Sequence, residues 1–125
     1  MSTITVDAEG EIDALDALMR KMNSGFFVLQ AAGATALATL TFAASAFASA
    51  TTSGSNATTS SNTISPAGTS SGTISLGKFQ NSGAKNIISF SISTSASDMN
   101  LTSIVIPTGT TQVSCSGVTV TLAIT

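Results

Sequence analysis

The sequence predicts an α+β protein in which a long N-terminal hydrophobic α-helix is followed by a small antiparallel β-sandwich head. Two observations carry this prediction. Residues 26–50 form an apolar run without a charge or a proline. After residue 72, apolar residues alternate with Ser and Thr at a period of two, as expected for strands with one buried face. At 125 residues the chain has room for one small domain beside the apolar run.

Composition excludes several classes of function. Charged residues make up 8% of the chain, against about a quarter in a typical soluble domain. The net charge of −2 provides no basic surface, so we expect no nucleic-acid partner. Histidine is absent and Cys115 is the single cysteine, which excludes a disulfide within the chain, a Cys/His metal site and a nucleophile–imidazole pair. We therefore expect neither an enzyme nor a cofactor.

Residues 1–25 are predicted to be either a retained amphipathic helix or a leader peptide that is later removed. Residues 1–6 are predicted to be a short β-prone or frayed lead-in. From Asp7 the apolar residues recur at three- and four-residue steps, with acidic residues at the start and Arg20 and Lys21 at the end, matching the helix dipole. The apolar residues of this face are Ile12, Leu15, Leu18, Met19 and Met22. Asn23-Ser24-Gly25 then ends the helix.

Residues 26–50 are predicted to form a hydrophobic helix for assembly or membrane insertion. Such a helix would be about 37 Å long, enough to cross the hydrocarbon core of a bilayer. Alanine favours a helix, and small residues four apart allow close helix–helix packing. The bulky residues of this helix, which we expect to make the assembly contacts, are Phe26, Phe27, Leu29, Leu37, Leu40, Phe42 and Phe47. Because the basic pair precedes the run, the N-terminus is expected on the cytoplasmic side and residues 51–125 outside.

Residues 51–72 are predicted to be a Ser/Thr-rich hinge, and residues 73–125 the β-sandwich head, of immunoglobulin-like or jelly-roll-like type. Turn signals such as Asn81-Ser82-Gly83 and Pro107-Thr108-Gly109 separate its alternating stretches. Two sequons, beginning at Asn56 and Asn100, predict glycosylation of the exported part.

The junction Arg20-Lys21-Met22-Asn23-Ser24-Gly25, followed by Phe26-Phe27-Val28-Leu29-Gln30, resembles the processing site of type IV pilins and related archaeal pilins. This resemblance implies cleavage after Gly25 by a prepilin-peptidase-like enzyme, a mature chain that begins at Phe26, and a filament core built from the hydrophobic helix. Gln30 would take the fifth mature position, which is commonly glutamate in bacterial members. An amide there replaces an ionic contact with a hydrogen bond.

The predicted function is that of a structural subunit of an extracellular surface filament, a pilus. The subunits would assemble into a homopolymer. Before assembly each subunit would be held in the cytoplasmic membrane, and in the filament its β head would point outward for adhesion. Two alternatives are an uncleaved coat or spike protein of a virion, and a secreted β domain whose signal peptide is cleaved after Ala50. The three differ in their mature N-terminus: Phe26 for the pilin, Met1 or Ser2 for the coat protein, and Thr51 for the secreted domain.

Overall fold

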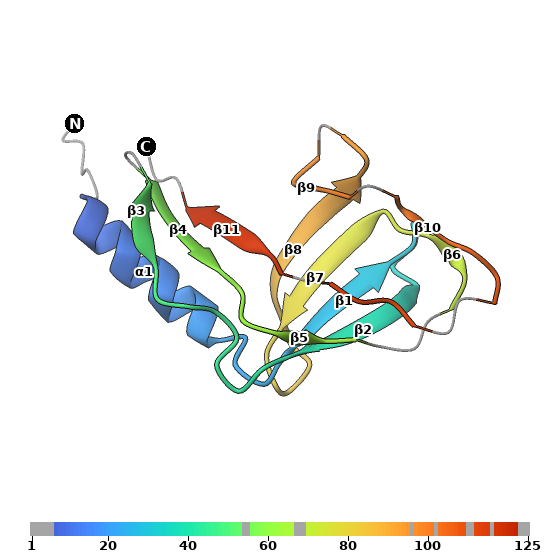
Figure 1. Cartoon of the computed structure of the whole chain (residues 1–125), viewed down its shortest axis with the longest axis horizontal. Coiled ribbons are helices and arrows are strands. Elements are labelled where there is room, and N and C mark those ends of the chain that lie inside the picture. The colour runs from blue at the N-terminus through green and yellow to red at the C-terminus, as the bar shows by residue number, and fades with distance from the viewer. Residues whose placement is uncertain are drawn as a thin grey trace.

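A computed structural model describes residues 7–53, 56–66, 70–95, 97–101, 103–109, 112–115 and 117–122. One α-helix, α1 (Ala8–Arg20), precedes a series of short strands (Figure 1). The strands are β1 (Phe26–Gln30), β2 (Ala36–Phe42), β3 (Thr51–Ser53), β4 (Asn56–Ser60), β5 (Ile64–Ser65), β6 (Gly72–Thr73), β7 (Leu76–Gln80), β8 (Asn86–Ser93), β9 (Met99–Asn100), β10 (Val105–Ile106) and β11 (Thr119–Leu122).

The predicted fold class is wrong, because the structure has no long N-terminal hydrophobic helix. The first part of residues 26–50 instead forms the antiparallel hairpin β1–β2, in which Phe27 lies opposite Leu40. Its turn uses left-handed backbone at Gly33 (φ +84°) and Ala34 (φ +65°). In the part of the chain that the structure describes, no helix has the length and apolar character needed to cross a membrane.

The physical reason lies in how this stretch is buried. An isolated apolar helix would leave its whole surface without a partner, whereas in the hairpin each apolar side chain packs within the same chain. The inward-facing residues recur with a period of two, Leu40 and Phe42 on β2 and Phe27 and Leu29 on β1. Tertiary packing therefore outweighs the helix propensity of alanine.

β1 lies at the centre of a six-stranded sheet with the order β5-β2-β1-β7-β8-β9. It pairs antiparallel with β2 on one side and with β7 on the other, so that Phe27 faces both Leu40 and Phe79. The β8–β9 pair is parallel, which makes the sheet mixed. The sheet curls (Figure 1).

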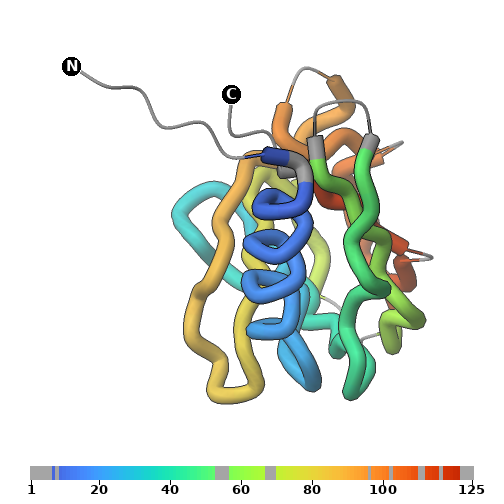
Figure 2. Tube along the Cα trace, turned by 90° about the vertical axis from the view of Figure 1, so that its left-hand side faces the viewer, coloured from blue at the N-terminus to red at the C-terminus, as the bar shows by residue number. Residues whose placement is uncertain are grey.

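A second layer consists of α1 and a three-stranded sheet with the order β11-β4-β3. α1 packs against β3 and β4, beside which it lies in both views (Figures 1 and 2). The inner side of β4 presents the buried Ala57 and Thr59. A separate two-stranded pair, β6 and β10, lies at the opposite end of the molecule from α1 (Figure 1).

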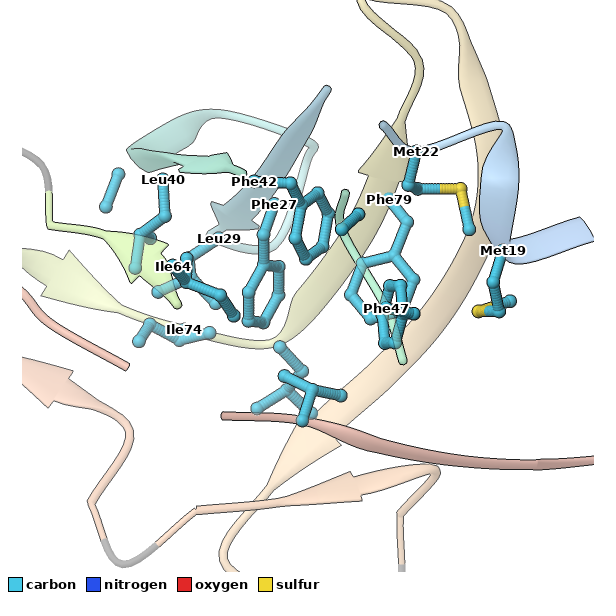
Figure 3. Close-up of a cluster of buried hydrophobic side chains, with 14 of the residues drawn as sticks. Met19, Met22, Phe27, Leu29, Leu40, Phe42, Phe47, Ile64, Ile74 and Phe79 are labelled. Carbon is cyan, nitrogen blue, oxygen red and sulfur yellow. The ribbon is translucent and has the colours of Figure 1, made fainter. Parts of the chain in front are cut away.

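The core between the layers is centred on phenylalanine (Figure 3). The ring of Phe27 stacks on that of Phe42 with centroids 6.4 Å apart, and meets Phe79 edge-on at 5.2 Å. Phe47 and Phe90 join the same cluster, at 5.4 Å from Phe42 and 5.0 Å from Phe79 respectively. Edge-to-face and offset ring pairs of this kind add about 0.5–1.5 kcal/mol each beyond the area that they bury.

α1 is an integral part of this core. Leu15 and Met19 are buried on its inner face, and Met22 is buried in the turn that follows the helix. The helix and the turn after it also bind the 43–50 segment: Asp16 Oδ1 accepts from Ala50 N at 2.7 Å, and Asn23 Oδ1 accepts from Ala46 N at 2.9 Å.

Candidate assembly surface

The outer face of the three-stranded sheet carries a regular array of hydroxyl groups. Thr51, Thr58 and Thr121 lie in one row across β3, β4 and β11, and Ser60 and Thr119 lie in the next row. Thr58 Oγ1 is 3.4 Å from Thr121 Oγ1, and Ser60 Oγ is 3.2 Å from Thr119 Oγ1. The face is therefore polar without being charged.

Among the described residues, β11 is an edge strand of this sheet and pairs with β4 alone. Val118 O accepts from Ser61 N at 2.8 Å, so residue 118 directs its carbonyl toward the β4 side. Ser60 O accepts from Ala48 N at 2.9 Å, on the side of β4 away from β11. Backbone groups point alternately to the two sides of a strand. Thr119 lies opposite Ser60 and therefore directs its N–H and C=O to the open side. Thr121, two residues further on, does the same.

A groove runs along this open edge. It consists of two cavities of about 190 Å³ and 300 Å³ that share the lining residues Asp98, Met99, Val118 and Thr119. The smaller cavity is also lined by Phe79, Ile88, Phe90, Val120 and Thr121. The larger one extends past Asn100 and Leu101 to Cys115 and Gly117. One wall of the groove is thus strand β11 with Cys115, Gly117 and Val118, and the other comes from β7, β8 and β9.

Half-buried apolar side chains form the floor of the groove. Ile88, Phe90 and Met99 pack against the core but stay partly exposed. The single charged residue that lines either cavity is Asp98. Its Oδ2 accepts from Ser91 N at 3.1 Å and from Ser91 Oγ at 3.3 Å, which fixes the carboxylate at the rim. The groove combines exposed backbone groups with an apolar floor, and an added strand needs both.

The predicted processing site lies inside the fold. Gly25 is buried, donates its N–H to Met22 O at 2.7 Å, and accepts from Phe42 N at 2.9 Å. Phe26 is half-buried and begins β1, opposite Thr41 and Gln80. The Gly25–Phe26 peptide bond is therefore part of the sheet in the folded chain, so that cleavage there would have to precede folding.

The predicted assembly residues lie in the interior of a single chain rather than on a helix surface. Six of them belong to the buried core: Phe27, Leu29, Leu37, Leu40, Phe42 and Phe47. Gln30 ends β1 and is also buried, with no hydrogen-bond partner for its Oε1 among the described residues. These side chains stabilise the fold. Apart from Asn100, a predicted glycosylation site, no residue of the groove was assigned a function from the sequence.

The two predicted glycosylation sites remain predictions. Asn100 is exposed in β9, and its Oδ1 accepts from Ser97 N at 3.1 Å. Thr102, which completes its sequon, lies outside the described residues. Asn56 begins β4 opposite Ser53, and its side chain lies outside the described part of the structure.

Comparisons with models of protein families, with curated proteins and with solved structures found no match. Within the described ranges, no group of three or more acidic or cysteine side chains is placed to hold a metal ion. The groove, the open edge of β11 and the hydroxyl face are therefore the features of the molecule that bear on its function.

Proposed function

We propose that the protein is a structural subunit of an extracellular surface filament, and that its subunits join through the open edge of β11. The observation that carries this proposal is an unprotected strand edge beside half-buried apolar residues. Soluble monomers usually protect such edges with a lysine, a proline or a bulge. β11 is Thr-Val-Thr-Leu and carries none of these. Subunit contact through this edge replaces the helix-mediated assembly that the fold contradicts.

The charge-poor hydroxyl face supports the same proposal. In a filament joined at the β11 edge, the row of Thr51, Thr58 and Thr121 would stay on the outside. Hydroxyl groups keep such a face hydrated without the mutual repulsion that a strongly charged surface would cause between neighbouring subunits.

The proposed subunit keeps residues 7–25, because α1 and the turn after it supply Leu15, Met19 and Met22 to the core. This burial favours a subunit that is not cleaved after Gly25. An uncleaved N-terminus is also expected for the alternative, the coat or spike protein of a virion. N-terminal sequencing of the assembled material distinguishes an uncleaved subunit from a processed pilin. Met1 or Ser2 supports the retained helix, and Phe26 contradicts it.

The assembly itself is tested with a backbone variant of the edge. Thr119→Pro removes an N–H that points away from β4, so the pairing of β11 with β4 is expected to survive. Thr119→Val is the matched control, because it also loses the hydroxyl but keeps the N–H. We expect wild type and Thr119→Val to form polymers in sedimentation velocity and negative-stain microscopy, and Thr119→Pro to remain monomeric. Polymers of Thr119→Pro with the same yield and form would contradict the proposal.

A further inference from the structure

The groove beside β11 sets requirements for the strand that could fill it. The strand must be extended, to pair with the N–H and C=O groups of Thr119 and Thr121. Every second side chain must be apolar, to cover Ile88 and Phe90, and the others must suit a hydroxyl-bearing outer face. β11 spans four residues, so four to six residues of about 3.3 Å each match its length.

One segment of the chain meets these requirements. The longer alternating stretches, such as those around Ile88 and Val120, are already strands of the fold. Of the stretches outside the described residues, residues 1–6 are the longest, and the others contain at most three residues. Residues 2–6 are Ser-Thr-Ile-Thr-Val, an uncharged stretch in which Ile4 and Val6 alternate with threonine. Ile4 and Val6 would face the apolar floor, and Thr3 and Thr5 would continue the hydroxyl face.

We propose that residues 2–6 of one copy add to β11 of the next copy as a fourth strand of the β11-β4-β3 sheet. Each copy has one such segment and one such groove, and they are different surfaces. The contact is therefore heterologous, the kind of contact that can repeat from copy to copy as an open filament. This inference rests on the proposed function and supplies its contact, namely the exchange of an N-terminal strand between neighbouring subunits.

The test separates the donor segment from the acceptor groove. Ile4→Asp/Val6→Asp places two charges on the apolar side of the donor and leaves the groove intact. Thr119→Pro blocks the groove and leaves the donor intact. Thr3→Asp/Thr5→Asp is the matched control, with the same added charge on the side of the segment that stays in water.

Each blocked variant is expected to sediment as a monomer, whereas Thr3→Asp/Thr5→Asp is expected to polymerise like wild type. A mixture of the two blocked variants is expected to stop at dimers, with twice the 12.4 kDa of one chain. In those dimers the intact segment of Thr119→Pro fills the intact groove of Ile4→Asp/Val6→Asp. A mixture that stays monomeric while wild type polymerises would overturn the strand exchange and leave the filament proposal standing.

A synthetic peptide of residues 1–6 provides a second measurement, which does not depend on polymer formation. It is expected to bind the Ile4→Asp/Val6→Asp variant and to lose binding at least tenfold when Thr119→Pro is added to that variant. If wild type is monomeric under all conditions while the peptide still binds the double Asp variant, the segment fills the groove of its own copy, and exchange between copies is wrong. Absence of peptide binding would overturn the assignment of the groove as a strand acceptor.

Discussion

Replacing Gly25 with alanine should strongly destabilise the fold, because backbone atoms surround this position on two sides. A Cβ at residue 25 would lie 2.0 Å from Gln80 O and 2.9 Å from Met22 O. Neither oxygen can move away as the end of a flexible side chain could. The clash would separate β1 from β7 at the start of their pairing, where Phe26 lies opposite Gln80.

The magnitude follows from the cost of overpacking, about 1–3 kcal/mol for one added methyl group in a well-packed site. With backbone on both sides, we expect the upper end, about 3 kcal/mol. For a domain of this size that corresponds to a fall of roughly 12 °C in Tm, at about 4 °C per kcal/mol. Urea titration and thermal melting followed by circular dichroism measure both quantities.

Gly83→Ala is the matched control. Gly83 lies in the turn between β7 and β8, and its added Cβ would meet only Asn81 Oδ1, at an ordinary contact distance of 3.4 Å. We expect this variant to stay within about 0.5 kcal/mol of wild type. If Gly25→Ala proves as stable as Gly83→Ala, the close approach at residue 25 is refuted, and a role for this glycine in processing becomes the better explanation.

Two further predictions concern single side chains. Glu11 is buried on α1, and its Oε2 has no hydrogen-bond partner among the described residues. Glu11→Met keeps the shape of the side chain and should raise the free energy of unfolding by about 1–3 kcal/mol. An unchanged or lower free energy of unfolding in urea titration would contradict this. A Cβ at Gly77 would lie 2.4 Å from the Phe90 ring and 2.8 Å from Ile92 Cδ1. Both contacts are with side chains rather than backbone, so Gly77→Ala should cost less than Gly25→Ala, about 1 kcal/mol. Adding Phe90→Leu to Gly77→Ala should recover part of that loss, and a strictly additive double mutant would refute the contact.

The sequence predicted those elements whose periodicity comes from one buried face. The helix expected from Asp7 to Met22 is close to α1 (Ala8–Arg20). Of the five expected inner residues, Leu15, Met19 and Met22 are buried, Ile12 and Leu18 are partly buried, and the buried Glu11 was not expected. The alternation around Ile88–Ile92 and Val118–Leu122 likewise coincides with β8 and β11. In both cases water on the opposite face imposes the pattern that a reader of the sequence can recognise.

The prediction failed at residues 26–50 because β1 is a central strand. From Phe27 to Gln30 it is buried on both faces, and a strand of that kind has a continuous apolar run that periodicity cannot distinguish from a buried helix. The turn between β1 and β2 contains Gly33 but no proline or asparagine, so the usual signal of a hairpin was weak. The threonines Thr39 and Thr41 on the exposed face of β2 were the remaining sign of a strand.

The groove could not have been found from the sequence, because its residues come from β7, β8, β9 and β11. Nothing in Thr-Val-Thr-Leu at residues 119–122 tells whether the strand has one neighbour or two. That depends on sheet order, which is set by pairings between distant parts of the chain. Whether Ile88 and Phe90 are fully covered likewise depends on how far the second layer extends over the first.

The central place of β1 in the sheet also has a consequence for biosynthesis. β2 follows β1 closely, but β7, its other neighbour, is made only after the Ser/Thr-rich middle of the chain. Closing so long a loop carries an entropic cost that must be met before the pairing gives any gain, which makes this step slow. Until residues 76–80 leave the ribosome, the most apolar segment of the protein therefore has one strand edge unpaired. During this interval the nascent chain is exposed to aggregation through that edge.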